Sequence, residues 1–518
     1  MLLHAKFDGE LFEVVKLTMS SVRASGILLH PTSFPSPFGI GDLGINAYQF
    51  IDFLKESCQQ YWQILPLGPT GFGNSPYMCY SAIAGNPLLI SPEKLKHKGF
   101  LIDTDFIDLP EFSEDRVDYQ LVIKTKIPLL QKACTNFKNN ANPEQQQAFT
   151  EFCQSKAYWL DDYALFMALK EHEKSASWHY WKPELSKRKQ QVIEAAKLHL
   201  VSELFYHKFL QYEFFHQWSE LKQYANKAGI HIIGDMPIYV AHDSADVWAN
   251  PDIFCLDEET GEAKLMAGAP PDYFSITGQF WGNPVYNWEE LEKQDFQWWI
   301  QRFESILDYV DIIRIDHFRG FEAYWAIPKG EETAINGKWI QAPGERLFST
   351  IRNKIGKLPV LAEDLGFITP EVVELRNHFE FPGMKVLHFA FGSNPDNPFL
   401  PFNLPRNCVM YTGTHDNNTT IGWFEQISDY ELYNLLTYIG CISPDGVHWD
   451  LIRLALTSVA DQTIIPLQDI FGLGSQARMN FPGKTEGNWE WRYQQQILIP
   501  EISEKLRNLT KLCGRAQQ

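Results

Sequence analysis

The stretch Tyr309-Val-Asp-Ile-Ile-Arg-Ile-Asp-His-Phe-Arg-Gly320 decides the fold, because an apolar run within it ends in charged residues. As a β-strand it places alternate side chains on opposite faces, so Arg314 and Asp316 share one face. A cation at this spacing favours an ionised carboxylate that can act as a nucleophile. The alternative is that Asp316 caps a following helix while Arg314 pairs with Asp311. His317 has no assigned role.

Seven other short apolar runs along the chain also end in Pro, Gly or charged residues. The eight runs are Gly26–His30, Gln60–Pro66, Ile230–Pro237, Val310–Asp316, Pro359–Glu363, Met384–Phe391, Val409–Thr414 and Thr463–Leu467. Eight strands separated by crossover segments are what a (β/α)8 barrel, or TIM barrel, requires. We therefore predict an α/β protein in which residues 1–518 form a single catalytic barrel domain with large helical and loop insertions in its βα connections.

Two long insertions interrupt this pattern. Residues from about 91 to 229 contain amphipathic helical patterns and are predicted to form a mainly helical lobe. Within it, the Gln- and Asn-rich segment around Asn136–Gln147 is expected to be a linker. The aromatic stripe of the last helix, from about Val201 to Ala228, is interpreted as core packing. Residues from about 241 to 288 are rich in Pro, Gly and aromatics and are expected to form a loop that covers the substrate.

Composition limits the classes of partner. The formal charge of −19 and the pI near 5.3 argue against nucleic acid, which requires a clustered basic face. No apolar run approaches the length of a membrane span or a signal peptide, and the eight cysteines lack a close C-x-x-C pair. These features favour a cytoplasmic protein with no membrane partner. The aromatic content of 14% suits a groove that presents flat faces to sugar rings.

Four of the eight runs end in acidic residues, namely Asp235, Asp316, Glu363 and Asp416. In a parallel barrel the carboxyl ends of all strands meet around one mouth, so these four side chains are expected to converge. Two carboxylates that flank one bond are the equipment of glycoside chemistry, with one ionised as nucleophile and the other protonated to release the leaving oxygen. The alternative for each residue taken alone is a purely structural acid.

The neighbours of these acids suggest their roles. Arg314 suits Asp316 to the nucleophilic role, whereas repulsion from Asp364 and desolvation would raise the pKa of Glu363 toward an acid/base role. His415 suggests recognition of a hydroxyl group beside Asp416, which would stabilise an oxocarbenium ion; a structural histidine is the alternative.

A metal site and a phosphate site were weighed as alternatives. A metal-dependent hydrolase would be indicated by a His-x-His pair at the end of the first run, which the sequence lacks. The segment Gly71–Tyr77 lacks the Lys of a phosphate-binding loop. We therefore expect neither a metal nor a cofactor.

Motifs along most of the chain resemble those of the 4-α-glucanotransferases called amylomaltases or disproportionating enzymes, within the α-amylase clan. The motifs are His30-Pro-Thr-Ser-Phe-Pro-Ser-Pro-Phe-Gly-Ile-Gly-Asp-Leu-Gly44, Gly73-Asn-Ser-Pro-Tyr77, Gly234-Asp-Met-Pro-Ile-Tyr239, Asp243-Ser-Ala-Asp-Val-Trp-Ala-Asn250, Pro270-Pro-Asp-Tyr-Phe-Ser275, Arg314-Ile-Asp-His-Phe-Arg-Gly320, Ala362-Glu-Asp-Leu-Gly366, Gly413-Thr-His-Asp-Asn-Asn418 and Arg478-Met-Asn-Phe-Pro-Gly483.

The resemblance implies a role for eight residues. Asp316 would be the nucleophile, Glu363 the acid/base and Asp416 the stabiliser of the transition state. The residues implied in substrate binding are Arg314, Asp235 and His415 for the donor sugar, Tyr77 as a stacking tyrosine and Trp281 in the acceptor-side loop.

The implied reaction transfers segments of α-1,4-glucans or maltooligosaccharides to the 4-hydroxyl of another glucan or of glucose, by a retaining double displacement. A retaining α-glucan hydrolase or a branching enzyme with the same catalytic groups is the alternative among enzymes. A catalytically silent glucan-binding or scaffold protein is the alternative from another class.

Overall fold

The computed structural model describes residues 6–7, 10–11, 23–271, 275–484 and 486–516. At its centre eight parallel strands close into a barrel, each paired with its neighbours in chain order and the last paired with the first. The barrel strands are β3 (Ala24–Leu28), β4 (Tyr61–Gln63), β5 (His231–Pro237), β8 (Ile312–Asp316), β11 (Val360–Ala362), β12 (Gly383–Val386), β13 (Cys408–Tyr411) and β14 (Gln462–Pro466). The predicted (β/α)8 barrel is confirmed.

Each of the eight apolar runs overlaps one barrel strand, but the run Met384–Phe391 continues well beyond it. There β12 ends at Val386 and a single 3-10 turn follows at Leu387–Phe389. Leu387 is fully buried, as are most residues of the strand before it. Lys385 is the one half-buried residue of this strand, so no alternating polar face marks where the strand changes to the turn.

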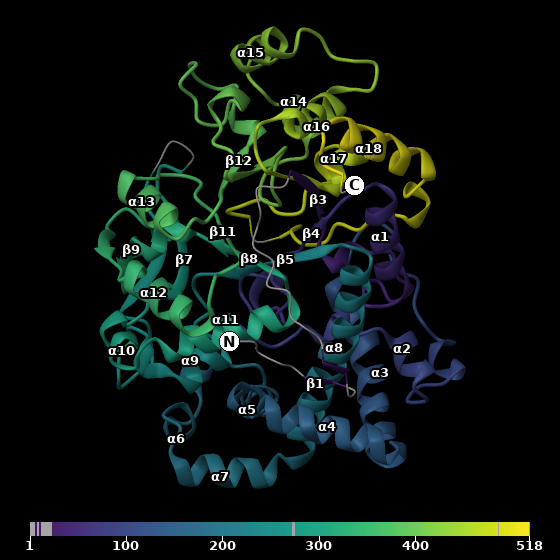
Figure 1. The fold of residues 1–518 in the computed structure, drawn as a ribbon. Coiled ribbons are helices and arrows are strands. Elements are labelled where there is room, and N and C mark those ends of the chain that lie inside the picture. The colour runs from purple at the N-terminus through teal and green to yellow at the C-terminus, as the bar shows by residue number, and fades with distance from the viewer. Residues whose placement is uncertain (1–5, 8–9, 12–22, 272–274, 485, 517–518) are drawn as a thin grey trace.

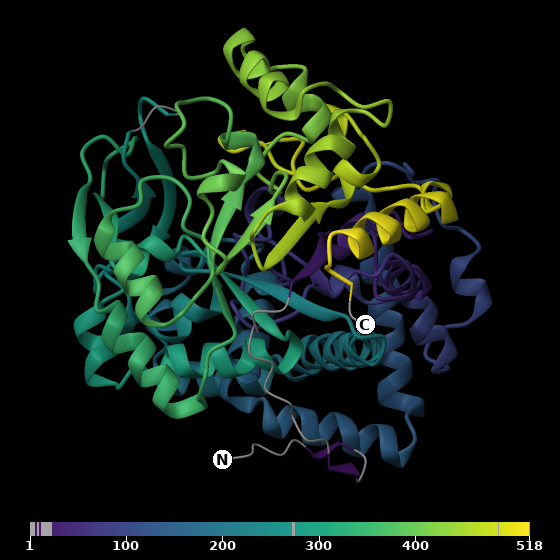
Figure 2. The same cartoon turned by 45° about the horizontal axis from the view of Figure 1, so that its top comes forward.

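Helices surround the barrel. Outside the 91–229 region they are α1 (Ile45–Glu56), α9 (Ala245–Ala249), α10 (Trp288–Lys293), α11 (Gln297–Tyr309), α12 (Gly344–Ile355), α13 (Pro370–His378), α14 (Thr420–Phe424), α15 (Asp429–Ile439), α16 (Val447–Thr457), α17 (Leu467–Ile470) and α18 (Pro500–Leu512). In both Figure 1 and Figure 2, α14, α15 and α16 lie on the opposite side of the barrel from α4.

The region from about 91 to 229 contains seven α-helices. They are α2 (Pro92–His97), α3 (Tyr119–Asn140), α4 (Pro143–Ser155), α5 (Ala157–His172), α6 (Pro183–Ser186), α7 (Gln190–His199) and α8 (Val201–Lys227). The linker expected around Asn136–Gln147 is wrong, because α3 extends to Asn140 and α4 begins at Pro143. The side chain of Asn142 caps α4 and Gln145 completes a capping box, so polar composition there marks helix ends and not a flexible segment.

The last helix of this region, α8, packs its aromatic stripe into the core as predicted, with Phe209 and Trp218 fully buried. Two buried glutamines on the same helix have a second task. Gln211 bonds both the N–H and the C=O of Gly85, and Gln217 does the same for Ser91. These bonds satisfy backbone groups that would otherwise be buried without partners, so α8 fixes the segment after β4.

The cover expected over residues 241–288 is only partly a loop. It contributes β6 (Leu265–Ala269) and β7 (Gln279–Pro284) to a four-stranded antiparallel sheet completed by β9 (Ala323–Pro328) and β10 (Lys338–Gln341), in the order β10-β9-β6-β7. Residues 272–274 of this region lie outside the described residues. The pairing of β6 with β9 joins two antiparallel pairs from separate segments of chain, and a two-stranded pair alone is only marginally stable.

A two-stranded pair, β1 (Lys6–Phe7) with β2 (Glu10–Leu11), precedes the barrel. All eight cysteines are free thiols. Across the described ranges, we find no helix with the length and apolar character needed to cross a membrane.

Candidate active site

The side chain of Arg314 joins two of the acids at the barrel mouth. Register places Asp235 on β5 opposite Arg314 on β8, so the two residues lie side by side. Nη1 of Arg314 donates to both carboxylate oxygens of Asp235 at 2.7 Å and to Oδ1 of Asp316 at 3.0 Å. Burial alone would lower the pKa of Arg314, but Asp235 and Asp316 outweigh it and raise that pKa well above its ordinary value.

These contacts decide whether Arg314 pairs with Asp316 or with Asp311 in the stretch Tyr309–Gly320. Arg314 and Asp316 share a face, as strand alternation predicts, whereas Asp311 pairs with Lys222 at 3.5 Å and accepts from the N–H of Ile232. The structural pair between Arg314 and Asp311 is therefore wrong. Asp316 keeps 30% of its side chain exposed, so its second oxygen can reach a ligand.

Tyr77 and His415 continue the network across the mouth. The hydroxyl of Tyr77 donates to Oδ2 of Asp235 at 2.8 Å and lies 3.0 Å from Nε2 of His415. Because the tyrosine proton goes to the carboxylate, Nε2 of His415 must carry a proton and donate to the hydroxyl oxygen. The two rings are stacked at 5.3 Å and 17°, and Trp489 packs against both.

Asp416 is held by residues whose roles the sequence did not suggest. Nδ2 of Asn480 donates to Oδ1 of Asp416 at 2.6 Å, and Nη2 of Arg478 donates to the backbone carbonyl of Asp416 at 2.5 Å. Nε2 of His415 lies 3.4 Å from the same carboxylate oxygen. Arg478 and Asn480 belong to the motif Arg478–Gly483, and that motif was the only signal in the sequence that these two residues contribute to the site.

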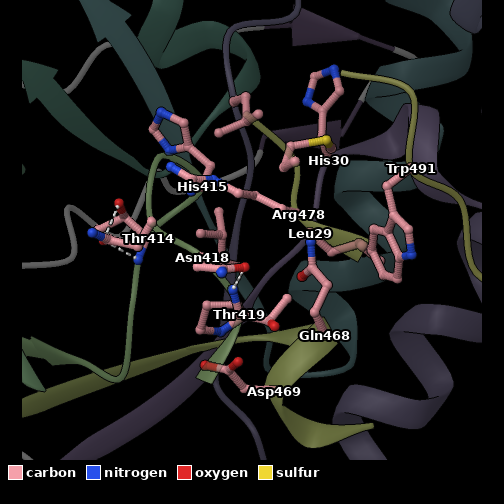
Figure 3. A pocket seen from close by; sticks show the side chains of 15 residues that line it. Leu29, His30, Thr414, His415, Asn418, Thr419, Gln468, Asp469, Arg478 and Trp491 are labelled. Carbon is pink, nitrogen blue, oxygen red and sulfur yellow. Dashed lines mark hydrogen bonds between the residues drawn. The ribbon is translucent and has the colours of Figure 1, made fainter. Parts of the chain in front are cut away.

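The loop that carries His415 and Asp416 is fastened at both ends by one buried acid, Asp469. Thr412 donates its hydroxyl to Oδ2 of Asp469 at 2.5 Å, and the N–H of Thr420 donates to Oδ1 at 2.7 Å. Burial raises the pKa of Asp469. Figure 3 shows the small cavity beside this loop, lined by His30, His415, Gln468, Asp469 and Arg478 among others.

Glu363 lies just beyond the end of β11, where two backbone N–H groups fix its carboxyl group. His317 donates to Oε2 at 2.7 Å and Leu365 donates to Oε1 at 2.8 Å. Burial, followed by the charge of Asp316, raises the pKa of Glu363 to about 7. The raised pKa of Glu363 agrees with the sequence prediction, but the predicted source of the neighbouring charge, Asp364, is wrong. Asp364 points away and forms an ion pair with Arg376.

His317 adopts a left-handed backbone conformation, with φ of 51° and ψ of 51°. This conformation is uncommon for a residue with a side chain and costs roughly 1 kcal/mol. It turns the N–H of His317 toward Glu363 and brings the His317 ring edge-on to Trp281 of β7 at 4.8 Å. Burial lowers the pKa of His317 to about 4, so the ring is neutral at pH 7.

Of the eight site residues predicted from sequence, six form one connected network across the mouth. They are Tyr77, Asp235, Arg314, Asp316, His415 and Asp416. Glu363 and Trp281 adjoin it through His317. Within the described ranges, no three side chains of the metal-binding types are grouped closely enough to ligate a metal ion.

Known proteins resemble this chain in sequence and in fold. The family model described as 4-alpha-glucanotransferase matches residues 29–497. A 4-alpha-glucanotransferase of Synechocystis sp. is 56% identical over 499 residues, 96% of this chain and 99% of that protein. A 4-alpha-glucanotransferase of Thermus thermophilus is 49% identical over 504 residues, 96% of this chain and 100% of that protein.

Among solved structures, the amylomaltase from Streptococcus agalactiae in complex with acarbose superposes with a TM-score of 0.92 at 39% identity, and the match covers 96% of this chain and 100% of that one. Sequence and fold therefore agree over nearly the whole length. The chain belongs to the 4-alpha-glucanotransferase family.

Proposed function

We propose that the chain transfers segments of α-1,4-glucans by a retaining double displacement, with Asp316 as nucleophile, Glu363 as acid/base and Asp416 as stabiliser of the transition state. One observation carries this assignment. Arg314 provides Asp316 with a cationic hydrogen-bond donor, whereas burial and the charge of Asp316 raise the pKa of Glu363 to about 7. Near neutral pH the pair thus offers one anion and one proton, which is what glycoside chemistry requires.

In the first half-reaction an oxygen of Asp316 attacks the anomeric carbon of the donor sugar. The bond from that carbon to the glycosidic oxygen breaks, and Glu363 gives its proton to this oxygen, which departs as the 4-hydroxyl group of the leaving glucan. The products are a glycosyl ester of Asp316, a free glucan end and the carboxylate of Glu363. Asp416, held by Asn480 and Arg478, faces the positive charge that develops on the sugar ring.

In the second half-reaction the carboxylate of Glu363 takes the proton from the 4-hydroxyl of an acceptor, whose oxygen attacks the same carbon. The ester bond breaks and Asp316 returns as a carboxylate. One α-1,4 bond is broken and an equivalent bond is formed, so the cycle balances in atoms, protons and electrons without a cofactor. Both displacements invert the carbon, and the net result is retention.

The substrate-binding residues are assigned by their contacts. Tyr77, Asp235, Arg314 and His415 form a polar floor that suits the hydroxyl groups of a donor sugar. The ring of Trp281 packs edge-on against the ring of His317 and suits the ring of an acceptor, including free glucose. The related amylomaltase from Streptococcus agalactiae binds acarbose, which favours a glucan-like ligand here.

Incubation with maltotriose tests the proposal. Transfer yields glucose together with a ladder of longer maltooligosaccharides, and proton NMR should find the new linkages as α-1,4. A retaining hydrolase would yield only shorter sugars, a branching enzyme would yield α-1,6 linkages, and a silent binding protein would leave maltotriose intact. Any of these three outcomes would overturn the proposed function.

A further inference from the structure

Two loops at the barrel mouth, residues 317–321 after β8 and residues 363–369 after β11, are joined by three hydrogen bonds. Two of them involve Glu363, which accepts from the N–H of His317 on its side chain at 2.7 Å and from the N–H of Phe318 on its backbone carbonyl at 3.1 Å. The third lies farther out, where Nη1 of Arg319 donates to the carbonyl of Phe367 at 2.7 Å. Arg319 therefore fixes the far end of the loop that begins with Glu363.

The surroundings of Arg319 are unusual for a buried cation. Its exposure is 5%, and burial lowers its pKa although Glu322 and Glu371 act in the opposite sense. Nε of Arg319 has no partner among the described residues. Burying a charge costs free energy unless other groups compensate. The compensation here is aromatic, because Cζ lies 3.7 Å from the ring centre of Trp339 and 5.4 Å from that of Phe367.

Trp339 connects Arg319 to the four-stranded sheet. It lies on β10, where it pairs with Trp325 of β9 and packs against that ring at 5.2 Å. Trp325 is in turn opposite Gly268 of β6, which is the neighbour of β7 and hence of Trp281. Arg319, which belongs to the loop after the proposed nucleophile, thus contacts the loop of the proposed acid/base and the sheet that carries Trp281.

We propose that Arg319 is a positioning residue that holds the Glu363 loop against the β10 side of this sheet and so sets how the glycosyl ester divides between a sugar acceptor and water. The proposal rests on the proposed function. An acceptor must approach from the side of Glu363, because the group that protonates the leaving oxygen also deprotonates the incoming one. Phe367, four residues beyond Glu363 and 67% exposed, presents its ring on that loop.

The test compares Arg319→Met, Arg319→Lys and a matched control, Arg352→Met. Arg352 also lies over an aromatic ring, that of Phe379 at 4.9 Å, but on the outer helix α12. Transfer is measured with maltotriose as donor and labelled glucose as acceptor, and hydrolysis as the net gain of reducing ends. Thermal unfolding and the pH profile of both reactions are recorded for each variant.

For Arg319→Met we expect transfer to fall about tenfold while hydrolysis falls less, so that their ratio shifts toward water. Arg319→Lys should recover part of the ratio, since lysine can still donate to Phe367 but has no flat face for Trp339. The control should leave both rates within about twofold. A ratio equal to that of the unmodified protein, with only thermal stability lowered, would overturn the proposal.

If Arg319→Met fails to fold, Trp339→Leu and Trp339→Phe decide the question. Removing the ring should shift the ratio in the same direction, and phenylalanine should restore most of it, whereas equal ratios in both variants would reject the role of Arg319. The proposed function fails separately. If the unmodified protein forms no ladder from maltotriose, the assignment of the reaction is wrong whatever these variants do.

Discussion

The donor and acceptor sides of the proposed site are built from different materials. On the donor side Tyr77, Asp235, Arg314 and His415 form a hydrogen-bonded chain in which Asp235 and Arg314 are almost fully buried. On the proposed acceptor side aromatic rings predominate, with Trp281 packed against the ring of His317 and Phe367 67% exposed.

This difference matches what each side has to do. A donor sugar must be held in one pose while charge develops on its ring, so directional hydrogen bonds suit it. In the proposed reaction the acceptor is glucose or the end of a glucan, and a flat ring face would bind each of them without fixing the chain that follows. The comparison predicts large effects for changes on the donor side and small ones on the acceptor side.

The largest effect is expected for the nucleophile. Asp316→Asn should lower kcat for maltotriose disproportionation by about 10³-fold or more, because an amide cannot form the glycosyl ester. Asp311→Asn is the matched control just before the start of the same strand, where Asp311 pairs with Lys222. It should change stability more than rate. Full activity in Asp316→Asn would break the assignment of the donor side.

A smaller loss is expected when Asp416 loses its support. Asn480→Ala removes a 2.6 Å hydrogen bond to a carboxylate and should lower kcat roughly 10- to 100-fold, as such bonds contribute about 1.5–3 kcal/mol. Asn480→Asp should be worse, because it places a second carboxylate against Asp416. Single-turnover measurements should locate the loss in formation of the glycosyl ester. An unchanged rate in both variants would contradict a role for Asn480.

The pH dependence sharpens the contrast between the two carboxylates. In the proposed first half-reaction Glu363 must be protonated, and its pKa is raised to about 7, so its acid form is lost as pH rises through 7. We expect kcat/KM for the donor to fall about tenfold between pH 6 and pH 8. A profile that stays flat over this range would mean that another group donates the proton.

The smallest effect is expected on the acceptor side. Trp281→Ala should raise the KM for glucose as acceptor about fivefold to tenfold, with little change in donor kinetics, because one ring face is lost. Phe402→Ala, at an aromatic side chain that is 62% exposed on a turn before β13, serves as the control. If Trp281→Ala instead impaired hydrolysis of the donor, the division into two sides would be wrong.

Much of the barrel could be predicted because its strands repeat one sequence pattern. A buried strand that ends in an acid is recognisable wherever it occurs, and parallel pairing brings such ends together; Asp235, Asp316 and Glu363 follow this rule. Alternation also explains why Arg314 meets Asp316 at 3.0 Å.

Other features depend on contacts that no local pattern reports. Arg478 and Asn480 reach Asp416 from more than 60 residues away along the chain. The sheet of β6, β7, β9 and β10 joins two separate segments, and neither segment shows its partner in its own sequence. Asp364 was wrongly predicted to raise the pKa of Glu363. Side chains of adjacent residues at a strand end diverge, and the carboxylate of Asp364 turns to Arg376.

The shared use of Nη1 of Arg314 by Asp235 and Asp316 has a consequence for charge balance through the catalytic cycle. In the proposed cycle Asp316 loses its negative charge when it becomes an ester, yet the buried cation keeps Asp235 as its counter-ion and is never left unpaired. At the same stage Glu363 loses the neighbouring anion that had raised its pKa, just when it must remain a carboxylate. A single proton can therefore pass back and forth between Glu363 and successive sugars while the rest of the site keeps its charges in place.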